Sequence, residues 1–242
     1  EPTGTSTGVT STSDGYQWKY MFTVRTADVG KFVTAEYIPV KVITADDSSG
    51  QFAVQDAAVD GAIDVIDVSA GGSGYLTNNG SFQAVTNATS MRIATTASAN
   101  DSVYIGSTLY IDGGKAAGLI REITSYTGAT RTVTVNTAFS TTPNTSSTYI
   151  VSPKVAISGD GTGAAAYSNV ATGGSAVNYI NMISTGSGYT NATVTISANT
   201  SFGSGATAVP YIGPRGGHGK NAREELGGSY VMVATEISGN EA

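Results

Sequence analysis

The stretch GAIDVIDVSAGGSGY at residues 61–75 recurs as SAVNYINMISTGSGY at residues 175–189. The apolar positions and the closing Gly-Ser-Gly-Tyr align at a constant offset, 175 − 61 = 114. Alternating apolar residues followed by paired glycines predict a strand that ends in a tight turn. A further strand, residues 194–197, follows the second copy at once, whereas its counterpart, residues 155–158, comes after a long insert. Duplication with insertion favours a modular architectural protein over an enzyme built around one pocket.

The composition favours short strands over helices. Glycine accounts for 31 of 242 residues and charged residues for only 12%, while apolar residues make up 40% and alternate regularly. Such a mixture suits strands joined by tight turns, and the regular alternation argues against disorder. We therefore predict a mainly β fold. Duplicated strand-turn modules would form a β-sandwich-like core, with a small inserted β-barrel or sandwich domain and one or two short helices.

The insert predicts a discontinuous domain organisation. We expect a flexible lead-in at residues 1–13 and a β core domain made of residues 14–75 and 153–242. Between the two parts of the core we expect an inserted small β domain at residues 76–152. Within the core, the internal repeat comprises residues 61–75 with 153–170, and then residues 175–212. Five segments of the insert have strand-like sequences, residues 103–105, 108–111, 118–123, 131–135 and 147–151. Short strands at this spacing are typical of a small barrel or sandwich.

Aromatic residues alternate with polar or flexible ones over residues 16–24. The alternation predicts a half-buried strand with Tyr16, Trp18, Tyr20 and Phe22 on one face. We interpret this face as part of the core or of a subunit interface. The alternative is a platform that binds carbohydrate. If the tryptophan is fully buried, Trp18→Ala would cost about 3–5 kcal/mol.

Other elements are predicted around the repeat. Residues 37–42 and 230–237 have strand-like sequences, and Thr26 is the expected N-cap of a short helical turn. Asn221 is the expected N-cap of a second short helix, which Gly227 would end. In the repeat itself, Tyr75 and its counterpart Tyr189 are expected to fold back over their glycine turns, because glycine lets other groups approach the backbone closely. Both tyrosines are candidates for structural or interface roles.

The glycine loop GPRGGHGK at residues 213–220 resembles a phosphate-binding loop only superficially. A P-loop needs Gly and then Ser or Thr where this chain has Pro214 and Asn221. His218 is the only histidine, so a catalytic triad or an imidazole metal site would depend on it alone. We predict a shaped loop that docks the following helix, with His218 in a structural or interface role.

Acidic residues offer no convincing acid/base pair for catalysis. Glu224 and Glu225 are explained by the dipole at a helix start. Five aspartates could either bind a structural calcium ion or be solvated by water. We favour solvated carboxylates for these residues, Asp46, Asp47, Asp64, Asp67 and Asp160. We predict no catalytic residues, no cofactor, no metal and no enzymatic activity.

The charge and composition of the chain restrict the classes of partner and site that it can have. The net charge is −6 and the 12 Lys and Arg residues form no cluster, which argues against a nucleic-acid surface. The chain has no cysteine, so disulfides and thiolate metal sites are excluded. No stretch approaches the roughly 18 apolar residues of a membrane helix. Because the chain begins with Glu1, we expect it to be a fragment of a longer protein.

Two blocks near the ends of the chain are similar to a known family. The first comprises residues 14–22 (DGYQWKYMF), 31–32 and 37–40, and the second comprises residues 216–219 (GGHG), 225–228 (ELGG) and 231–233. In sequence, order and separation they resemble the baseplate wedge proteins of contractile-tailed phages (myoviruses), especially the longer marine and cyanophage versions. Arg215 departs from the pattern, because a second proline is expected there. The middle of the chain resembles modules common in phage structural proteins.

This resemblance implies a structural virion protein without enzymatic activity, located in the tail baseplate and assembled in the host cytoplasm. Such proteins bridge neighbouring wedge and fibre-attachment proteins, often as homodimers, and take part in baseplate assembly and rearrangement. It also makes Glu225, within the second block, a candidate interface residue beside His218. The rival function is a receptor- or glycan-binding tail-fibre or adhesin module, which predicts exposed aromatic residues in a groove. Neither function implies a nucleic-acid or membrane partner.

Overall fold

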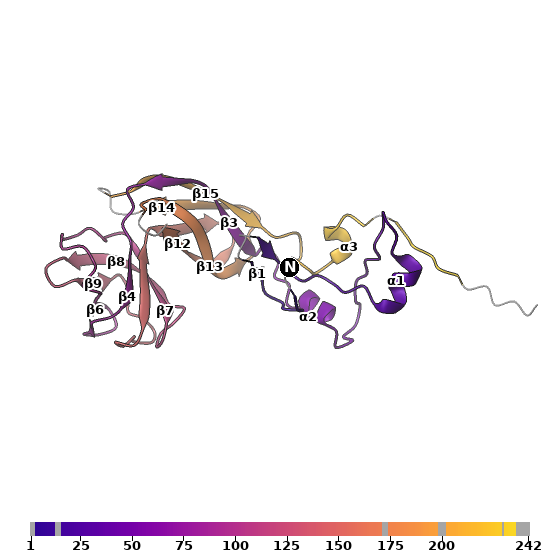
Figure 1. The fold of residues 1–242 in the computed structure, drawn as a ribbon, viewed down its shortest axis with the longest axis horizontal. Helices are drawn as coiled ribbons and strands as arrows, with labels where there is room; N and C mark the ends of the chain where they lie inside the picture. The colour runs from indigo at the N-terminus through magenta and orange to yellow at the C-terminus, as the bar shows by residue number, and fades with distance from the viewer. Residues whose placement is uncertain (1–2, 13–15, 171–173, 198–201, 229, 236–242) are drawn as a thin grey trace, which may run out of the picture. The chain divides into compact units, whose positions relative to one another are not determined.

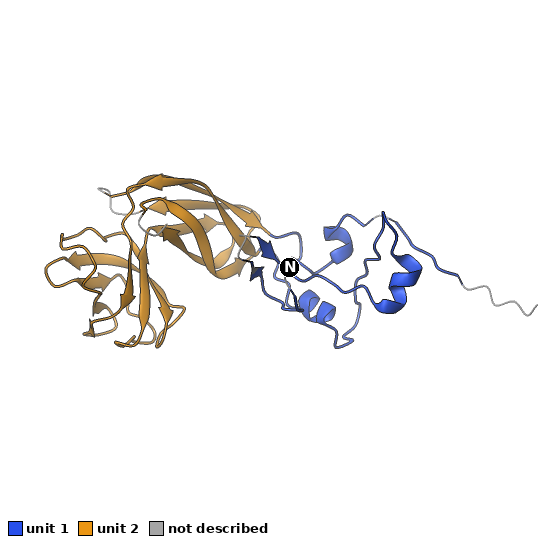
Figure 2. Ribbon diagram, viewed as in Figure 1, with its two compact units in different colours: residues 1–61, 213–242 blue, residues 62–212 orange. Residues whose placement is uncertain are grey.

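The chain folds into two compact units. The computed structural model describes residues 3–12, 16–170, 174–197, 202–228 and 230–235. Unit 1 comprises residues 1–61 and 213–242, and unit 2 comprises residues 62–212 (Figure 2). The insert and both copies of the repeat therefore lie together in unit 2, and the division falls inside the predicted core domain. Strands far outnumber helices, which confirms the predicted mainly β fold (Figure 1).

Six strands of unit 2 come from the repeat. The first copy provides β3, β11 and β12, and the second provides β13, β14 and β15. Their bounds are Ile63–Ser73, Lys154–Gly159, Thr162–Val170, Val177–Ser187, Ala192–Ser197 and Ser204–Ile212. Every antiparallel pair joins one strand from each copy: β3 with β15, β12 with β13, and β11 with β14. The two copies are thus interlocked rather than placed side by side.

The strand register reveals an internal two-fold axis. Thr162 lies opposite Ser187, and shifting each to the other copy (162 + 42 = 204; 187 − 114 = 73) gives the observed pair Ser204 and Ser73. The same shift applies along both ladders, and their register irregularities coincide. In the β11–β14 ladder the axis passes through the pair Ala156 and Thr195, since the neighbouring pairs exchange under the rotation. The duplication seen in the sequence is therefore a rotational symmetry of the fold.

The interior of this six-stranded assembly is a β-sandwich-like core. Its strands are neighbours in the cyclic order β3, β15, β14, β11, β12, β13. Symmetry-related residues are buried together, among them Ile63 with Val177 and Ile66 with Ile180. Burial of these side chains provides the driving force for closing the strands around one core.

Tyr75 and Tyr189 fasten the two copies to each other. Both are buried, and each ring lies against a glycine that precedes the last strand of the other copy. A side-chain Cβ at Gly203 would overlap the ring of Tyr75, and one at Gly161 would overlap the ring of Tyr189. The predicted approach to its own turn is present for Tyr189, whose ring lies against Gly186. The contacts with Gly161 and Gly203 cross between copies, which the spacing in the sequence did not indicate. The Tyr75 hydroxyl also accepts a hydrogen bond from the Ala206 amide at 3.2 Å.

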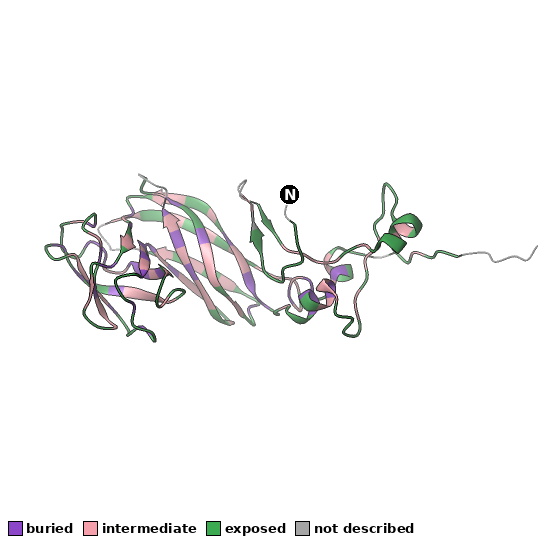
Figure 3. Ribbon diagram, turned by 60° about the horizontal axis from the view of Figure 1, so that its bottom comes forward, coloured by how far each residue is buried: buried purple, intermediate pink, exposed green. Residues whose placement is uncertain are grey.

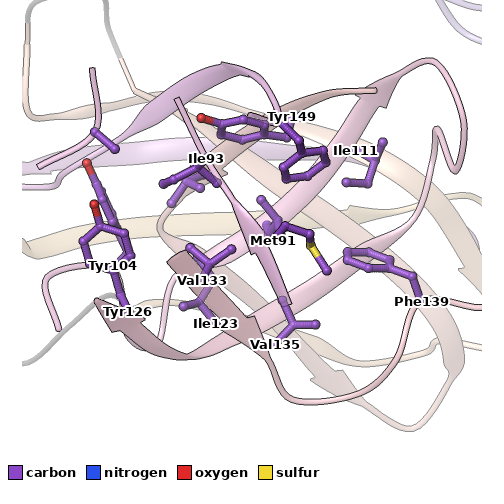
Figure 4. Close-up of a cluster of buried hydrophobic side chains, with 14 of the residues drawn as sticks. Met91, Ile93, Tyr104, Ile111, Ile123, Tyr126, Val133, Val135, Phe139 and Tyr149 are labelled. Atoms are coloured by element: carbon purple, nitrogen blue, oxygen red, sulfur yellow. The ribbon is translucent and has the colours of Figure 1, made fainter. Parts of the chain in front are cut away.

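The insert forms one antiparallel sheet of seven strands in the order β4-β10-β7-β8-β9-β6-β5. Their bounds are Asn78–Ser81 (β4), Ala84–Val85 (β5), Ser90–Arg92 (β6), Thr108–Gly113 (β7), Ile120–Thr127 (β8), Thr132–Val135 (β9) and Thr148–Ser152 (β10). The sheet curls around its own core of aromatic and aliphatic side chains (Figure 4). Strands are confirmed within residues 108–111, 118–123, 131–135 and 147–151.

One predicted strand of the insert is wrong. Residues 103–105 lie in turns, although Val103 and Tyr104 are buried in the core. Tyr104 packs edge-on against Tyr126, with ring centroids 4.8 Å apart, and its hydroxyl accepts a hydrogen bond from the Ser98 amide at 3.1 Å. Burial of apolar residues in a turn produces the same sequence pattern as a short strand. The missed strands β4, β5 and β6 have only four, two and three residues, and β4 consists of Asn, Gly and Ser, which are typical of turns.

Unit 1 contains little regular structure. Its elements are β1 (Thr10–Ser11), β2 (Gln17–Trp18), α1 (Thr26–Phe32), α2 (Gly50–Asp56) and α3 (Ala222–Glu225). The helix near Thr26 is confirmed, but Thr26 is its first residue and the N-cap is Arg25, which makes no side-chain cap bond. The Asn221 cap is confirmed, because its side chain accepts a bond from the Glu224 amide at 3.3 Å. Gly227, with a φ of 68°, follows the end of α3. Helix α2, capped by Ser49, was not predicted.

The strands predicted for unit 1 are largely wrong. Only Gln17–Trp18 of residues 16–24 is a strand, and it pairs with β1 in the predicted lead-in. Residues 37–42 and residues 230–235 form no strand, and residues 236–237 lie outside the described part. In the described part of unit 1, Val54 and Ala222 are the buried hydrophobic residues, and both hydrophobic clusters lie in unit 2. A strand pattern without a core to cover it does not form a sheet.

Candidate interaction groove in unit 1

An apolar groove of about 680 Å³ lies within unit 1. One wall comes from α1 and the chain that follows it, and the other from α3 and the chain that follows it. The lining residues are Asp28, Phe32, Glu36, Tyr37, Ile38, Pro39, Val40, Lys41, Arg223, Leu226, Gly227, Gly228, Tyr230, Val231 and Met232. Most are apolar, and the volume is in the range of clefts that bind ligands or peptide segments.

Large apolar side chains around this groove are exposed. Tyr230 is 78% exposed, Val231 90% and Val233 78%. Tyr37, Ile38 and Leu226, on the facing segments, are each about half exposed. Exposed positions also predominate along α1 and the neighbouring chain (Figure 3). Large exposed apolar patches are commonly interaction sites, which makes this groove a candidate for one.

Two buried glutamines hold one end of the groove. The Gln51 amide nitrogen donates to the Lys41 carbonyl at 2.5 Å, and the Gln55 side chain bonds both the N–H and the C=O of Ile43, at 2.9 and 2.8 Å. Both glutamines lie on α2, four residues apart, so they share one helix face. They fix the chain directly after the groove-lining residues. In the sequence this arrangement is visible only as an i, i+4 glutamine pair, and polar residues at that spacing do not by themselves predict burial.

The loop at residues 213–220 positions the other wall. The Glu225 carboxylate contacts Nδ1 of His218 and accepts a hydrogen bond from the Gly219 amide at 2.9 Å. The structure therefore brings the two predicted interface candidates of this region into direct contact. Glu225 has a specific partner in the loop, so the helix dipole explains only part of its role. The loop docks α3, as predicted, and so places Arg223 and Leu226 at the groove.

The aromatic residues near position 18 are not a buried core. Tyr16 is 65% exposed and Trp18 is 46% exposed, so the interpretation of these residues as core is wrong, while a subunit interface stays a prediction. Their ring centroids are 6.2 Å apart, and the Trp18 Nε1–H donates to the Thr12 hydroxyl at 3.2 Å. Tyr20 and Phe22 are half-buried. Because Trp18 is not fully buried, the loss of about 3–5 kcal/mol expected for a buried tryptophan does not apply to Trp18→Ala.

The structure places the remaining candidate residues where they support the fold. Tyr75 and Tyr189 are core residues of unit 2 rather than surface contacts. Asp160 accepts hydrogen bonds from the Thr190 hydroxyl and from the amides of Thr190 and Asn191, and these bonds hold the pKa of its carboxyl well below the usual range. This carboxylate closes the turn after Tyr189. Within the described ranges, no three acidic or histidine side chains gather to hold a metal ion.

Two further findings bear on the function. In the described residues, no helix has the length and apolar character needed to cross a membrane. Comparisons with protein-family models, curated proteins and solved structures find no match to this chain.

Proposed function

We propose that this protein is a structural component of a phage tail baseplate wedge that bridges neighbouring wedge and fibre-attachment proteins through unit 1. The observation that carries the proposal is the exposed apolar groove in a unit that buries few hydrophobic residues of its own. A stable contact between proteins buries more than about 1,000 Å², much of it apolar at the centre. Unit 1 provides apolar surface suited to that purpose.

The positions of the family-like residues support the same proposal. Residues 31–32, 37–40 and 231–233, which resemble the wedge proteins, include Phe32, Ile38 and Val231 of the groove lining. His218 and Glu225, also in those blocks, fix α3 beside it. The resemblance is thus concentrated where the chain exposes apolar surface. The proposed protein acts through buried area, without enzymatic activity or a cofactor, as a homodimer in the virion.

Location in the particle tests this proposal directly. Antibodies raised against the chain should label the baseplate end of purified contractile tails, and mass spectrometry should detect its peptides in baseplate fractions. The variant Ile38→Asp should reduce incorporation, because it places a charge in the groove. Val209→Asp, at an exposed position of unit 2, is the matched control. Absence from tails, or turnover of a substrate by the purified chain, would overturn the proposal.

A second candidate function rests on Tyr16 and Trp18. Two exposed aromatic rings beside each other can stack on a sugar, which favours a glycan-binding tail-fibre or adhesin module. Titration of Trp18 fluorescence with a panel of glycans tests it. Saturable quenching that Trp18→Ala abolishes would support this candidate, and an unchanged signal over the whole panel would reject it.

A further inference from the structure

Tyrosine side chains meet where the insert contacts the repeat in unit 2. Strand β7 belongs to the insert, and β12 and β13 belong to the repeat (Figure 1). The rings of Tyr110 on β7 and Tyr167 on β12 stack, with centroids 4.3 Å apart and planes 17° from parallel. Burial raises the pKa of Tyr167, and three neighbouring groups raise it further: Tyr110, Tyr179 and Asp112. Side chains from three strands therefore gather at one surface.

These side chains point away from the hydrophobic cores. Along β12 every second residue from 166 to 170 is buried, which leaves Tyr167 and Asn169 on the outer face. The register places Asn181 opposite Tyr167 and Tyr179 opposite Asn169. Tyr110, flanked on β7 by two buried residues, likewise points away from the core of the insert. Tyrosines and asparagines thus alternate across β12 and β13, with the two tyrosines diagonal to each other.

The side chains of this surface are available to a ligand. Tyr179 is 47% exposed. Asn169 and Asn181 are half-buried, and within the described residues their side-chain amides have no hydrogen-bond partner in the protein. Each amide offers both donors and an acceptor. Because stacking on Tyr110 fixes the ring of Tyr167, little side-chain entropy is lost when a ligand binds beside it.

The internal two-fold axis provides a comparison for this surface. At the related positions of the other copy, Val209 lies opposite Asp67 and Tyr211 lies opposite Val65. That face has one tyrosine, no asparagine and a carboxylate. The same ladder therefore forms without the alternation of tyrosine and asparagine, so strand pairing does not account for the alternation on β12 and β13.

We propose that this tyrosine patch binds an uncharged oligosaccharide. The patch is defined by Tyr110, Asp112, Tyr167, Asn169, Tyr179 and Asn181. A sugar ring has an apolar C–H face that stacks on an aromatic ring, here Tyr179, and a rim of hydroxyls that bond to amides and carboxylates, here Asn169, Asn181 and Asp112. The site lies outside the groove of unit 1, so the inference goes beyond the proposed function.

Charge and polarity favour an uncharged sugar over other occupants. The one charged member of the patch is Asp112, whose carboxylate repels an anionic polysaccharide but accepts hydrogen bonds from sugar hydroxyls. An apolar peptide segment would cover Asn169 and Asn181 and leave their amides without hydrogen bonds, which is unfavourable. A neutral chain of hexoses satisfies the rings and the amides together.

Calorimetric titration of the full chain tests the proposal. The probes are maltohexaose, cellohexaose and mannohexaose, with hexagalacturonate as the anionic counterpart. At least one neutral probe should bind with a dissociation constant below about 1 mM, and Tyr179→Ala should raise that constant at least about tenfold. Tyr179 is at an exposed position, so this variant should fold normally. Tyr211→Ala is the matched control, since Tyr211 is 56% exposed on the related face, and it should bind as the unmodified chain does.

Nuclear magnetic resonance locates the bound sugar. Amide resonances of residues 167–169 and 179–181 should shift on titration, and those of residues 65–67 and 209–211 on the related face should not. Binding of no neutral probe at about 10 mM would overturn the proposal, as would equal affinity for hexagalacturonate or indifference to Tyr179→Ala. Binding that Trp18→Ala abolishes would also overturn it and assign the sugar to the ring pair of unit 1. The baseplate location is measured separately in tails, so a chain found there that binds no sugar would reject this inference and leave the proposed function standing.

Discussion

Units 1 and 2 treat their apolar residues in opposite ways. In unit 2 the large apolar side chains are gathered into two cores, and both copies of the repeat contribute to one of them. In unit 1 they line an exposed groove, and the element ends are held by polar side chains such as Gln51, Gln55 and Glu225. Similar strand-like sequences therefore give a sheet where a partner strand exists within the chain and an unpaired segment where it does not.

The largest loss of stability is expected for a substitution in the core of the insert, and it tests the contrast between the two units. Ile123 is fully buried, so Ile123→Ala should lower the free energy of unfolding by about 2–5 kcal/mol. Val231→Ala, at an exposed position of unit 1, should change it by less than about 0.5 kcal/mol in the single chain. Urea denaturation at a concentration where the chain is monomeric measures both. Equal losses would mean that Val231 is buried and that the contrast between the units is wrong.

Glycine substitutions test the contacts of Tyr75 and Tyr189 with glycines of the other copy. Gly203→Ala places a methyl group against the Tyr75 ring at a φ of 81°, and should cost about 2–4 kcal/mol through overlap and backbone strain. The symmetry-related Gly161→Ala should be destabilising through overlap with Tyr189. Gly118→Ala is the control, since its φ is 86° but the space is open, and about 1–2 kcal/mol of strain is expected. Equal melting temperatures for all three variants would contradict the role of these tyrosine–glycine contacts.

A smaller effect is expected at a buried tyrosine of the insert. The Tyr149 hydroxyl donates to Asn78 Oδ1 at 2.5 Å and accepts from the Ala94 amide at 2.7 Å. Tyr149→Phe leaves both groups without that partner and should cost about 1–3 kcal/mol. Chemical denaturation at neutral pH measures the loss. No change would indicate that water replaces the hydroxyl.

The same tyrosine predicts an alkaline pH dependence. Burial raises the pKa of Tyr149 to about 12, above the value near 10 of the unfolded chain. Its contribution to stability is therefore fully present below pH 10 and is lost as the pH rises toward 12. Tyr149→Phe should reduce this alkaline loss without abolishing it, because burial also raises the pKa of Tyr126 to about 12. Melting temperatures between pH 8 and pH 12 test the difference.

The smallest effect concerns the turn after Tyr189. Hydrogen bonds from Thr190 and Asn191 lower the pKa of Asp160 below that of the unfolded chain. The contribution of this carboxylate is present above about pH 4 and is lost as the pH falls further. Asp160→Asn should therefore flatten the acid limb of a melting-temperature profile between pH 6 and pH 2. Thr190→Val, which removes the hydroxyl donor, should act in the same direction, and an unchanged limb in both variants would contradict the assignment.

The sequence predicted the repeat strands well because periodicity and glycine position act locally. The strand expected within residues 61–75 is observed as β3, and the strand expected at residues 194–197 lies within β14. The exchange of strands between copies was beyond prediction, because interlocked and side-by-side arrangements bury the same alternate residues. Residues 16–24 misled for a related reason: their alternation describes a strand face, but not whether a core exists to cover it.

The candidate site was predicted only in its parts. His218 and Glu225 were both named, yet their contact depends on the loop closing against α3, which spacing alone does not specify. Residues 37–42 and 230–237, which include much of the groove lining, have strand-like sequences, and the exposure of Tyr37, Ile38, Tyr230 and Val231 follows from the scarcity of buried hydrophobic residues in the described part of unit 1. The glutamines of α2 escaped notice, because polar residues on a short helix rarely indicate burial.

The chain enters unit 2 through β3 and leaves it through β15, and Ile63 lies opposite Ile212 at the end of that ladder. Tension between the two connecting segments would therefore pull at one end of a hairpin-like pair. Hydrogen bonds loaded in that direction rupture one after another, as a zipper opens, instead of resisting together in shear. Unit 2 would consequently yield to low force at this corner first, while the β11–β14 and β12–β13 ladders remained closed.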